Sequence, residues 1–161
     1  MTLIHYSADA LEKAKLSPRT QVQTFGYKPY GLWVSVEGPR DWKEWCKAEG
    51  FRSNTFAKAN YVTLASTANI LRLSSVTDID LFSEQYHAVN RNNMRGNINW
   101  PAVAEKYDGI IIAPYIWQRR LSDNPDHFWY YGWDCASGCI WNTEVIEEIH
   151  TKELVANAQD S

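Results

Sequence analysis

Four short segments of this 161-residue chain carry side chains that could hold or transform a ligand. The first is His5-Tyr6-Ser7, which we expect where a strand ends and a helix begins. There the imidazole can hydrogen-bond a ligand, and the Ser7 hydroxyl with the first helical amides can receive a polar or anionic group. A partly buried His5 beside a Ser7 that only caps the helix is the simpler alternative.

Tryptophan dominates the second and third segments. They are Gly31-Leu32-Trp33-Val34-Ser35 and Asp41-Trp42-Lys43-Glu44-Trp45-Cys46, in a chain with eight Trp and nine Tyr. If Trp33 points out of its strand and Trp45 off its helix, two indole faces could sandwich a flat ring, at about 1–3 kcal/mol per ring. Alternatively, Trp42 and Trp45 form the core face of their helix. The aromatic excess indicates a stacking groove, a Trp-rich core, or both.

The fourth segment spans residues 132–142 and is rich in small residues, which allow close approach of a ligand or another backbone. Asp134 is its only carboxylate and Ser137 its only hydroxyl. The spacing is not that of a nucleophile elbow, and a Ser-His-Asp triad is only weakly indicated. Cys135 and Cys139 lack nearby partners for a zinc site, and three cysteines are too few for a disulfide framework.

Periodicity and capping residues predict the elements that position these segments. We expect strands at residues 3–6, 32–36, 61–65, 70–73, 109–113, 128–133 and 138–141, with 61–65 and 70–73 as a possible hairpin. We expect helices at residues 8–16, 41–50, 78–89 and 100–106, and a last short helix after Thr143. The third helix would turn Leu81, Phe82, Tyr86 and Val89 inward.

Strands and short helices without regular alternation predict an α+β fold in a single domain over residues 2–150, followed by a polar, frayed tail at 151–161. Asp+Glu (19) outnumber Lys+Arg (16), which excludes a nucleic-acid binder that works by bulk positive charge. No segment is long and apolar enough to span a membrane and no signal segment is evident, so we expect a cytoplasmic protein. Dinucleotide-fold, P-loop, zincin and hydrolase motifs are missing.

The order of these segments resembles the ADP-ribosyltransferase superfamily, in its poly(ADP-ribose) polymerase-like, H-Y-E branch. His5-Tyr6-Ser7 resembles the family's His-Gly-Ser/Thr strand end, and Gly31-Leu32-Trp33-Val34-Ser35 its Gly-x-Tyr-Phe-Ala/Ser strand. Trp45-Cys46 falls where the family has a Tyr-Cys pair. Residues 139–146 resemble its last strand, and Tyr107-Asp108-Gly109-Ile110 a strand that often precedes it.

The resemblance implies a split antiparallel β-sheet with flanking helices and NAD as substrate. His5, Tyr6 and Ser7 would hold the ribose and carboxamide of NAD. Trp33, with Ser35 beside it, and Trp45 would replace the two Tyr that stack on nicotinamide. The family's catalytic Glu falls at Ser137, which cannot supply a negative charge, so Asp134 would have to assist or the transferase activity would be lost or changed.

Three functions follow as hypotheses. The chain transfers ADP-ribose from NAD to a macromolecular acceptor, protein or nucleic acid, with Asp134 or Ser137 assisting. Alternatively, the same groove is a catalytically inactive module that binds NAD, ADP-ribose or another nucleotide. A third possibility is a nucleic-acid binding or processing protein that adds Arg91, Arg95, Arg119 and Arg120 to the Trp groove. The sequence leaves the acceptor and the oligomeric state open.

Overall fold

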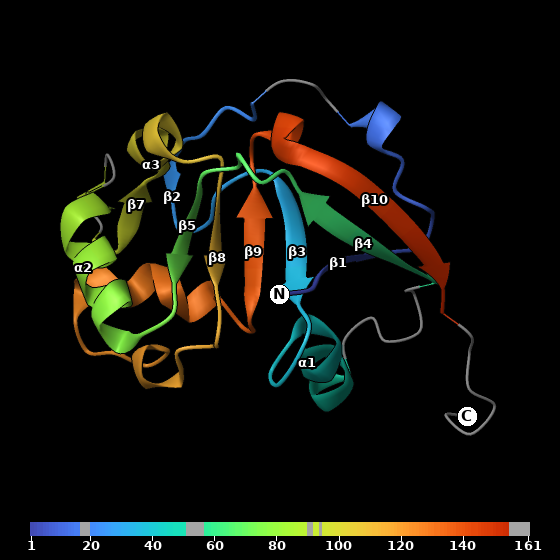
Figure 1. The fold of residues 1–161 in the computed structure, drawn as a ribbon. Coiled ribbons are helices and arrows are strands. Elements are labelled where there is room, and N and C mark those ends of the chain that lie inside the picture. Colours follow the sequence, from blue (N-terminus) through green and yellow to red (C-terminus); the bar gives the residue numbers. More distant parts are fainter. Residues whose placement is uncertain (17–19, 51–56, 90–91, 94, 155–161) are drawn as a thin grey trace.

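The computed structural model describes residues 1–16, 20–50, 57–89, 92–93 and 95–154. Its main feature is a seven-stranded sheet of order β10-β4-β1-β3-β9-β8-β5 (Figure 1). The strands are β1 (Leu3–Ser7), β3 (Leu32–Val36), β4 (Lys58–Leu64), β5 (Ile70–Leu73), β8 (Gly109–Ile112), β9 (Ser137–Ile140) and β10 (Ile146–Glu153). All neighbours are antiparallel except β5 and β8. The expected α+β class is confirmed.

The sheet parts between β1 and β3. Their pairing consists of Leu3 with Val36 and Ile4 with Ser35. Beyond Ile4, β1 stays paired with β4 as far as Ser7, while β3 stays paired with β9. As Figure 1 shows, β1, β4 and β10 therefore lead away to one side, and β3, β9, β8 and β5 stand together on the other.

A smaller sheet and most of the helices cover the β5 side of the molecule (Figure 1). The small sheet has the order β2 (Phe25–Gly26), β7 (Asn97–Asn99), β6 (His87–Ala88). The α-helices are α1 (Trp42–Glu49), α2 (Val76–Tyr86) and α3 (Trp100–Lys106). Single 3-10 turns are η1 (Lys13–Lys15), η2 (Trp117–Arg119) and η4 (Thr143–Val145), and a longer 3-10 helix is η3 (Pro125–Gly132).

Local capping explains the two best-predicted helices. Asp41 accepts the amide of Glu44 at the start of α1, and Gly50 closes that helix in the left-handed conformation, φ 63°. Asn99 accepts the amide of Ala102 at the start of α3, with Pro101 in the first turn. The expected strands β3 and β8 are also confirmed. All four residues of β8 are buried, as its continuous apolar run predicts.

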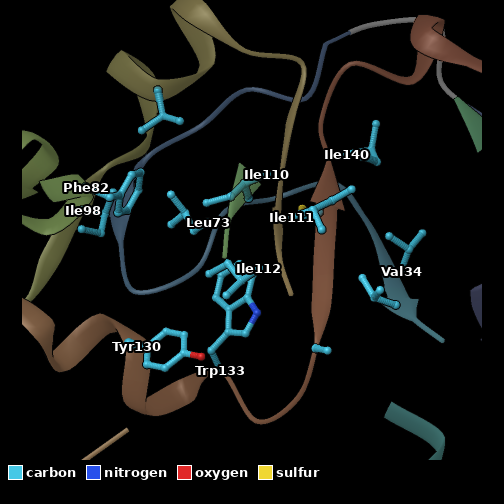
Figure 2. Close-up of a cluster of buried hydrophobic side chains, with 14 of the residues drawn as sticks. Val34, Leu73, Phe82, Ile98, Ile110, Ile111, Ile112, Tyr130, Trp133 and Ile140 are labelled. Carbon is cyan, nitrogen blue, oxygen red and sulfur yellow. The ribbon is translucent and has the colours of Figure 1, made fainter. Parts of the chain in front are cut away.

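The core lies between the β5-β8-β9 part of the sheet and the helices that cover it. Figure 2 shows Ile110 and Ile112 of β8 on the side of Phe82, Ile98 and Trp133, and Ile111 pointing the other way, toward β9. Four Trp are fully buried: Trp100, Trp129, Trp133 and Trp141. Half of the eight Trp are therefore part of the core, which agrees with the interpretation of the aromatic excess as a Trp-rich core.

The expected helix over residues 8–16 is wrong. Ser7 remains in β1, opposite Lys58, and only the turn η1 follows. The reason lies in Asn60 of β4, whose amide donates to the Ser7 hydroxyl (2.8 Å) and whose Oδ1 accepts the main-chain amide of Leu11 (2.9 Å). This distant side chain holds the segment open where local sequence favours a helix.

The expected final helix is also wrong, because residues 146–153 form β10. Ile146 and Ile149 are three residues apart, which suggests a helical face. A register shift between Ile146 and Glu148 marks a bulge, and the bulge breaks the two-residue alternation that identifies a strand. β10 also extends to Glu153, into the expected tail, whereas residues 155–161 lie outside the described part of the chain.

Three further expectations fail for reasons of packing. Strands β4 and β5 form no hairpin, because β4 lies between β1 and β10 while β5 pairs with β8. Residues 128–133 belong largely to η3, where Trp129 and Tyr130 are buried side by side. On α2, Leu81 is exposed because the buried face is set by Ile79, Phe82, Ser83 and Tyr86, and Val89 lies beyond the helix and is exposed.

Candidate functional site

A cavity of about 360 Å³ opens where β1 and β3 part. Its walls come from both strands, from the start of α1 and from the segment between η3 and β9. The lining residues are Ile4, His5, Tyr6, Lys28, Trp33, Val34, Ser35, Trp42, Gly132, Trp133, Asp134, Cys135 and Ser137.

Six of the eight predicted site residues line this one cavity: His5, Tyr6, Trp33, Ser35, Asp134 and Ser137. Ser7 and Trp45 do not. Ser7 is held by Asn60 and donates to the main-chain carbonyl of Asp9. Trp45 packs behind Trp42, with ring centroids 5.0 Å apart and an angle of 12° between the planes. Trp42 therefore occupies the wall position that the sequence analysis gave to Trp45.

His5 bridges the two strands at the mouth of the split. Its Nδ1 lies 2.7 Å from the main-chain oxygen of Trp33. A carbonyl can only accept, so Nδ1 carries a proton and donates it; in the neutral form of the ring, Nε2 is then an acceptor. An acceptor nitrogen on this wall suits a hydroxyl donor such as a ribose hydroxyl.

The indole of Trp33 forms the aromatic wall. It meets Trp133 at 4.9 Å between centroids with a tilt of 59°, and the ammonium group of Lys28 lies 5.5 Å from its centroid. Trp33 is half-buried, as Trp42 is. The aromatic surface is thus partly accessible and is bordered by one cation.

Trp133 differs from the other buried indoles in its hydrogen bonding. The N–H groups of Trp100, Trp129 and Trp141 donate to the Gly26 carbonyl, the Ser83 hydroxyl and the Tyr107 carbonyl, at 3.1, 3.0 and 2.7 Å. The Trp133 N–H has no acceptor among the described residues, although its ring is 1% exposed. In Figure 2 its nitrogen lies on the side of the ring that faces β9. A buried donor without an acceptor costs about 1–3 kcal/mol.

The two serine hydroxyls of the cavity already have partners. Ser35 accepts the main-chain amide of Trp42 at 2.9 Å, which ties β3 to the start of α1. Ser137 donates to the main-chain carbonyl of Cys135 at 3.1 Å. Ser35 can still donate to a ligand and Ser137 can still accept, so both are suited to binding.

Asp134 is the only carboxylate among the lining residues. Its Oδ1 lies 3.7 Å from Nη2 of Arg120, and each side chain is 27% exposed. Burial, with Asp41 nearby, raises the pKa of Tyr6 to about 12, so this lining residue is a neutral phenol at physiological pH. The negative charge of the cavity therefore resides on Asp134.

All three cysteines are buried and none of them is in a disulfide. Burial raises the pKa of Cys135 to about 12 and that of Cys139 well above its usual range, so these two thiols stay protonated at neutral pH. Within the described ranges, no group of three or more His, Cys, Asp or Glu side chains could hold a metal ion.

The sequence analysis missed a polar network that connects α2 with η2 and η3. Arg119 donates to both carboxylate oxygens of Asp80, at 2.6 and 2.8 Å, and His127 Nε2 lies 3.4 Å from the same carboxylate. His127 Nδ1 is 2.8 Å from the Ser122 hydroxyl, which also accepts the Asn124 amide. The Ser-His-Asp chain thus anchors η2 and η3 to α2, and Arg119 is engaged there. Arg95 pairs with Asp126, and Arg91 lies outside the described residues.

Comparison with known proteins finds no match: no protein-family model, curated protein or solved structure is significantly similar to this chain. Among the residues described, no helix has the length and apolar character to cross a membrane. The function must therefore be argued from the cavity itself.

The buried imidazole of His127 predicts how stability depends on pH. Burial is the main cause that lowers the pKa of His127 below its ordinary value of 6.5, while Asp80 opposes the shift. As pH falls below 6.5, the unfolded chain takes up a proton that folded His127 resists, so the free energy of unfolding should fall. We expect this decline in urea unfolding between about pH 7 and pH 5.

The variant His127→Gln cannot take up this proton and should show a shallower decline than the natural chain. The exposed His150 on β10 provides the matched control, and His150→Gln should keep the original slope. Equal slopes for the natural chain and His127→Gln would contradict this account of the network.

Proposed function

We propose that the chain is an NAD-dependent mono-ADP-ribosyltransferase-like protein that transfers ADP-ribose to a macromolecular acceptor. The observation that carries the proposal is the convergence of His5, Trp33 and Asp134 on one cavity from three distant parts of the chain. The split β-sheet of that superfamily is likewise a proposal here, supported by the parting of β1 from β3.

The chemistry of the lining fits one end of NAD. Trp33 and Trp42 supply flat surface for the nicotinamide ring, and His5 Nε2 can accept a ribose hydroxyl. A carboxamide oxygen drawn into the cavity could satisfy the N–H of Trp133 after a small shift of the wall. At about 360 Å³ the cavity lies at the lower end of small-molecule sites, so it would enclose the nicotinamide half and leave the adenosine half outside.

Transfer requires the glycosidic bond between the nicotinamide nitrogen and ribose C1′ to break. The bonding electron pair leaves with nicotinamide, and positive charge develops on the ribose. The Asp134 carboxylate can stabilise that charge, which Ser137 can only hydrogen-bond. The acceptor then forms a bond to C1′ and releases a proton to solvent.

A second function has an observation in its favour. The Arg120 guanidinium lies 3.7 Å from Asp134 and offsets part of the carboxylate charge. If that offset persists with NAD bound, the cavity would bind the dinucleotide without cleaving it. The chain would then be an NAD-binding or ADP-ribose-binding module.

The stacking role predicts a binding defect. Trp33→Ala removes the aromatic wall and should weaken NAD binding by about tenfold or more in calorimetry, in line with the cost of losing one stacked ring. Phe25→Ala, which removes an exposed aromatic ring that does not line the cavity, serves as the control and should bind NAD like the natural chain. Failure of the natural chain to bind NAD at millimolar concentration would remove the proposal.

The charge of Asp134 predicts a separate defect in turnover. Asp134→Asn keeps the shape of the side chain and removes its charge, so NAD should still bind while release of nicotinamide falls by about 100-fold or more. Chromatography of released nicotinamide measures the rate. If the natural chain binds NAD and releases no nicotinamide over hours, the binding-module alternative is correct. An unchanged rate in Asp134→Asn would show that this carboxylate plays no part.

A further inference from the structure

A second groove, of about 520 Å³, lies beside the candidate site and shares Gly132 with it. Its wall is mainly aromatic and apolar. The lining residues are Tyr27, Arg120, Leu121, Ser122, His127, Phe128, Tyr131 and Gly132. None of them is a carboxylate.

Three aromatic rings of this groove are open to solvent. Tyr27, Phe128 and Tyr131 are 43%, 47% and 59% exposed. Phe128 and Tyr131 belong to η3, and residues three apart in a 3-10 helix lie on the same side. Trp129 and Tyr130, between them, are buried in the core and fix the direction of the exposed pair. Phe128 and Tyr131 are thus presented by a 3-10 helix that is anchored in the core.

One cation of this groove, Arg120, lies over an aromatic ring of its lining and over the neighbouring Trp117 ring. The Arg120 guanidinium is 5.9 Å from the centroid of Tyr131 and 5.8 Å from that of Trp117, which is 56% exposed. Arg40 lies 5.0 Å from the same Trp117 ring. Arg120 also approaches Asp134, so the same side chain borders both the groove and the candidate site.

Several exposed rings beside a guanidinium group suit the recognition of single-stranded nucleic acid, in which unpaired bases stack on aromatic rings and phosphates contact Arg. A duplex hides its bases and cannot use the rings. An apolar peptide would bury Leu121 and Phe128 but would gain nothing from guanidinium groups placed over aromatic faces. The chain has a net charge of -3, which disfavours tight binding of a polyanion through charge. It is compatible with a nucleic-acid substrate that binds weakly, mainly through stacking.

We propose that this groove holds the acceptor, and that the acceptor is a single-stranded nucleic acid. This inference rests on the proposed transferase function and names its substrate class. The shared Gly132 and the bridging Arg120 would bring a stacked nucleotide next to the ribose carbon that reacts. The acceptor atom on the nucleic acid would attack C1′ as nicotinamide departs.

Binding of nucleic acid is measured without NAD, so that it is independent of the first cavity. The probes are fluorescently labelled DNA and RNA oligonucleotides about 12 nucleotides long, single-stranded and as duplexes, followed by anisotropy at low and at moderate salt. We expect single strands to bind at least fivefold more tightly than duplexes, with affinity falling as salt rises. Comparison of the DNA and RNA oligonucleotides shows which of the two nucleic acids is preferred.

The variant Tyr131→Leu keeps apolar bulk and removes the ring, and should weaken single-strand binding by about fivefold or more. Tyr61→Leu is the matched control, because Tyr61 also has a cation over its ring, Lys152 at 4.9 Å, but belongs to β4 in the other part of the sheet. Equal affinity of the natural chain and Tyr131→Leu, or no binding to any single strand at low salt, would overturn the proposal.

Labelled NAD then distinguishes this inference from the function on which it rests. Transfer of label to single strands, and less to duplexes, is the expected result. Transfer of label only to protein would overturn the acceptor while the transferase function stands. Binding of oligonucleotides without any binding of NAD would overturn both the acceptor role and the proposed function.

Discussion

The candidate site depends on the hydrogen bond from His5 Nδ1 to the Trp33 carbonyl, which is 2.7 Å long and lies where β1 and β3 part. The register of β1 and β3, continued by two residues from the Ile4–Ser35 pair, would set Tyr6 opposite Trp33. Instead, the His5 imidazole donates to the Trp33 carbonyl, and the two strands are no longer paired beyond Ile4 and Ser35. The same contact fixes the tautomer of His5 and orients its Nε2 as an acceptor. The same side chain thus bridges the two strands where their pairing ends and lines the cavity between them.

The distribution of tryptophan separates the packing of this protein from its chemistry. Trp100, Trp129 and Trp141 are buried and have acceptors for their N–H groups, as stable cores require. Trp133 is equally buried but lacks an acceptor among the described residues, and it lies in the cavity wall. Under the proposed function, a carboxamide oxygen bound in the cavity would accept this N–H and remove the cost.

Local rules predicted the elements that depend on local residues. Asp41 and Gly50 delimit α1, and Asn99 starts α3, because caps act over three or four residues. Distant contacts decided the failures: Asn60 holds residues 7–11 open, and pairing with β4 makes β10 a strand. The gathering of His5, Trp33 and Asp134 was expected only through a family resemblance. The choice of Trp42 over Trp45 as the wall depends on how α1 sits against β3, which helical spacing alone cannot give.

The proposed function requires the gap between β1 and β3 to bind NAD. The indole N–H signals in a ¹H–¹⁵N correlation spectrum test this binding most directly. Each Trp gives one such signal, and Trp→Phe variants assign them. On adding NAD, the signals of Trp33 and Trp133 should move progressively, while those of Trp100, Trp129 and Trp141 should stay in place. A spectrum in which Trp33 and Trp133 remain unmoved at saturating NAD would contradict the account.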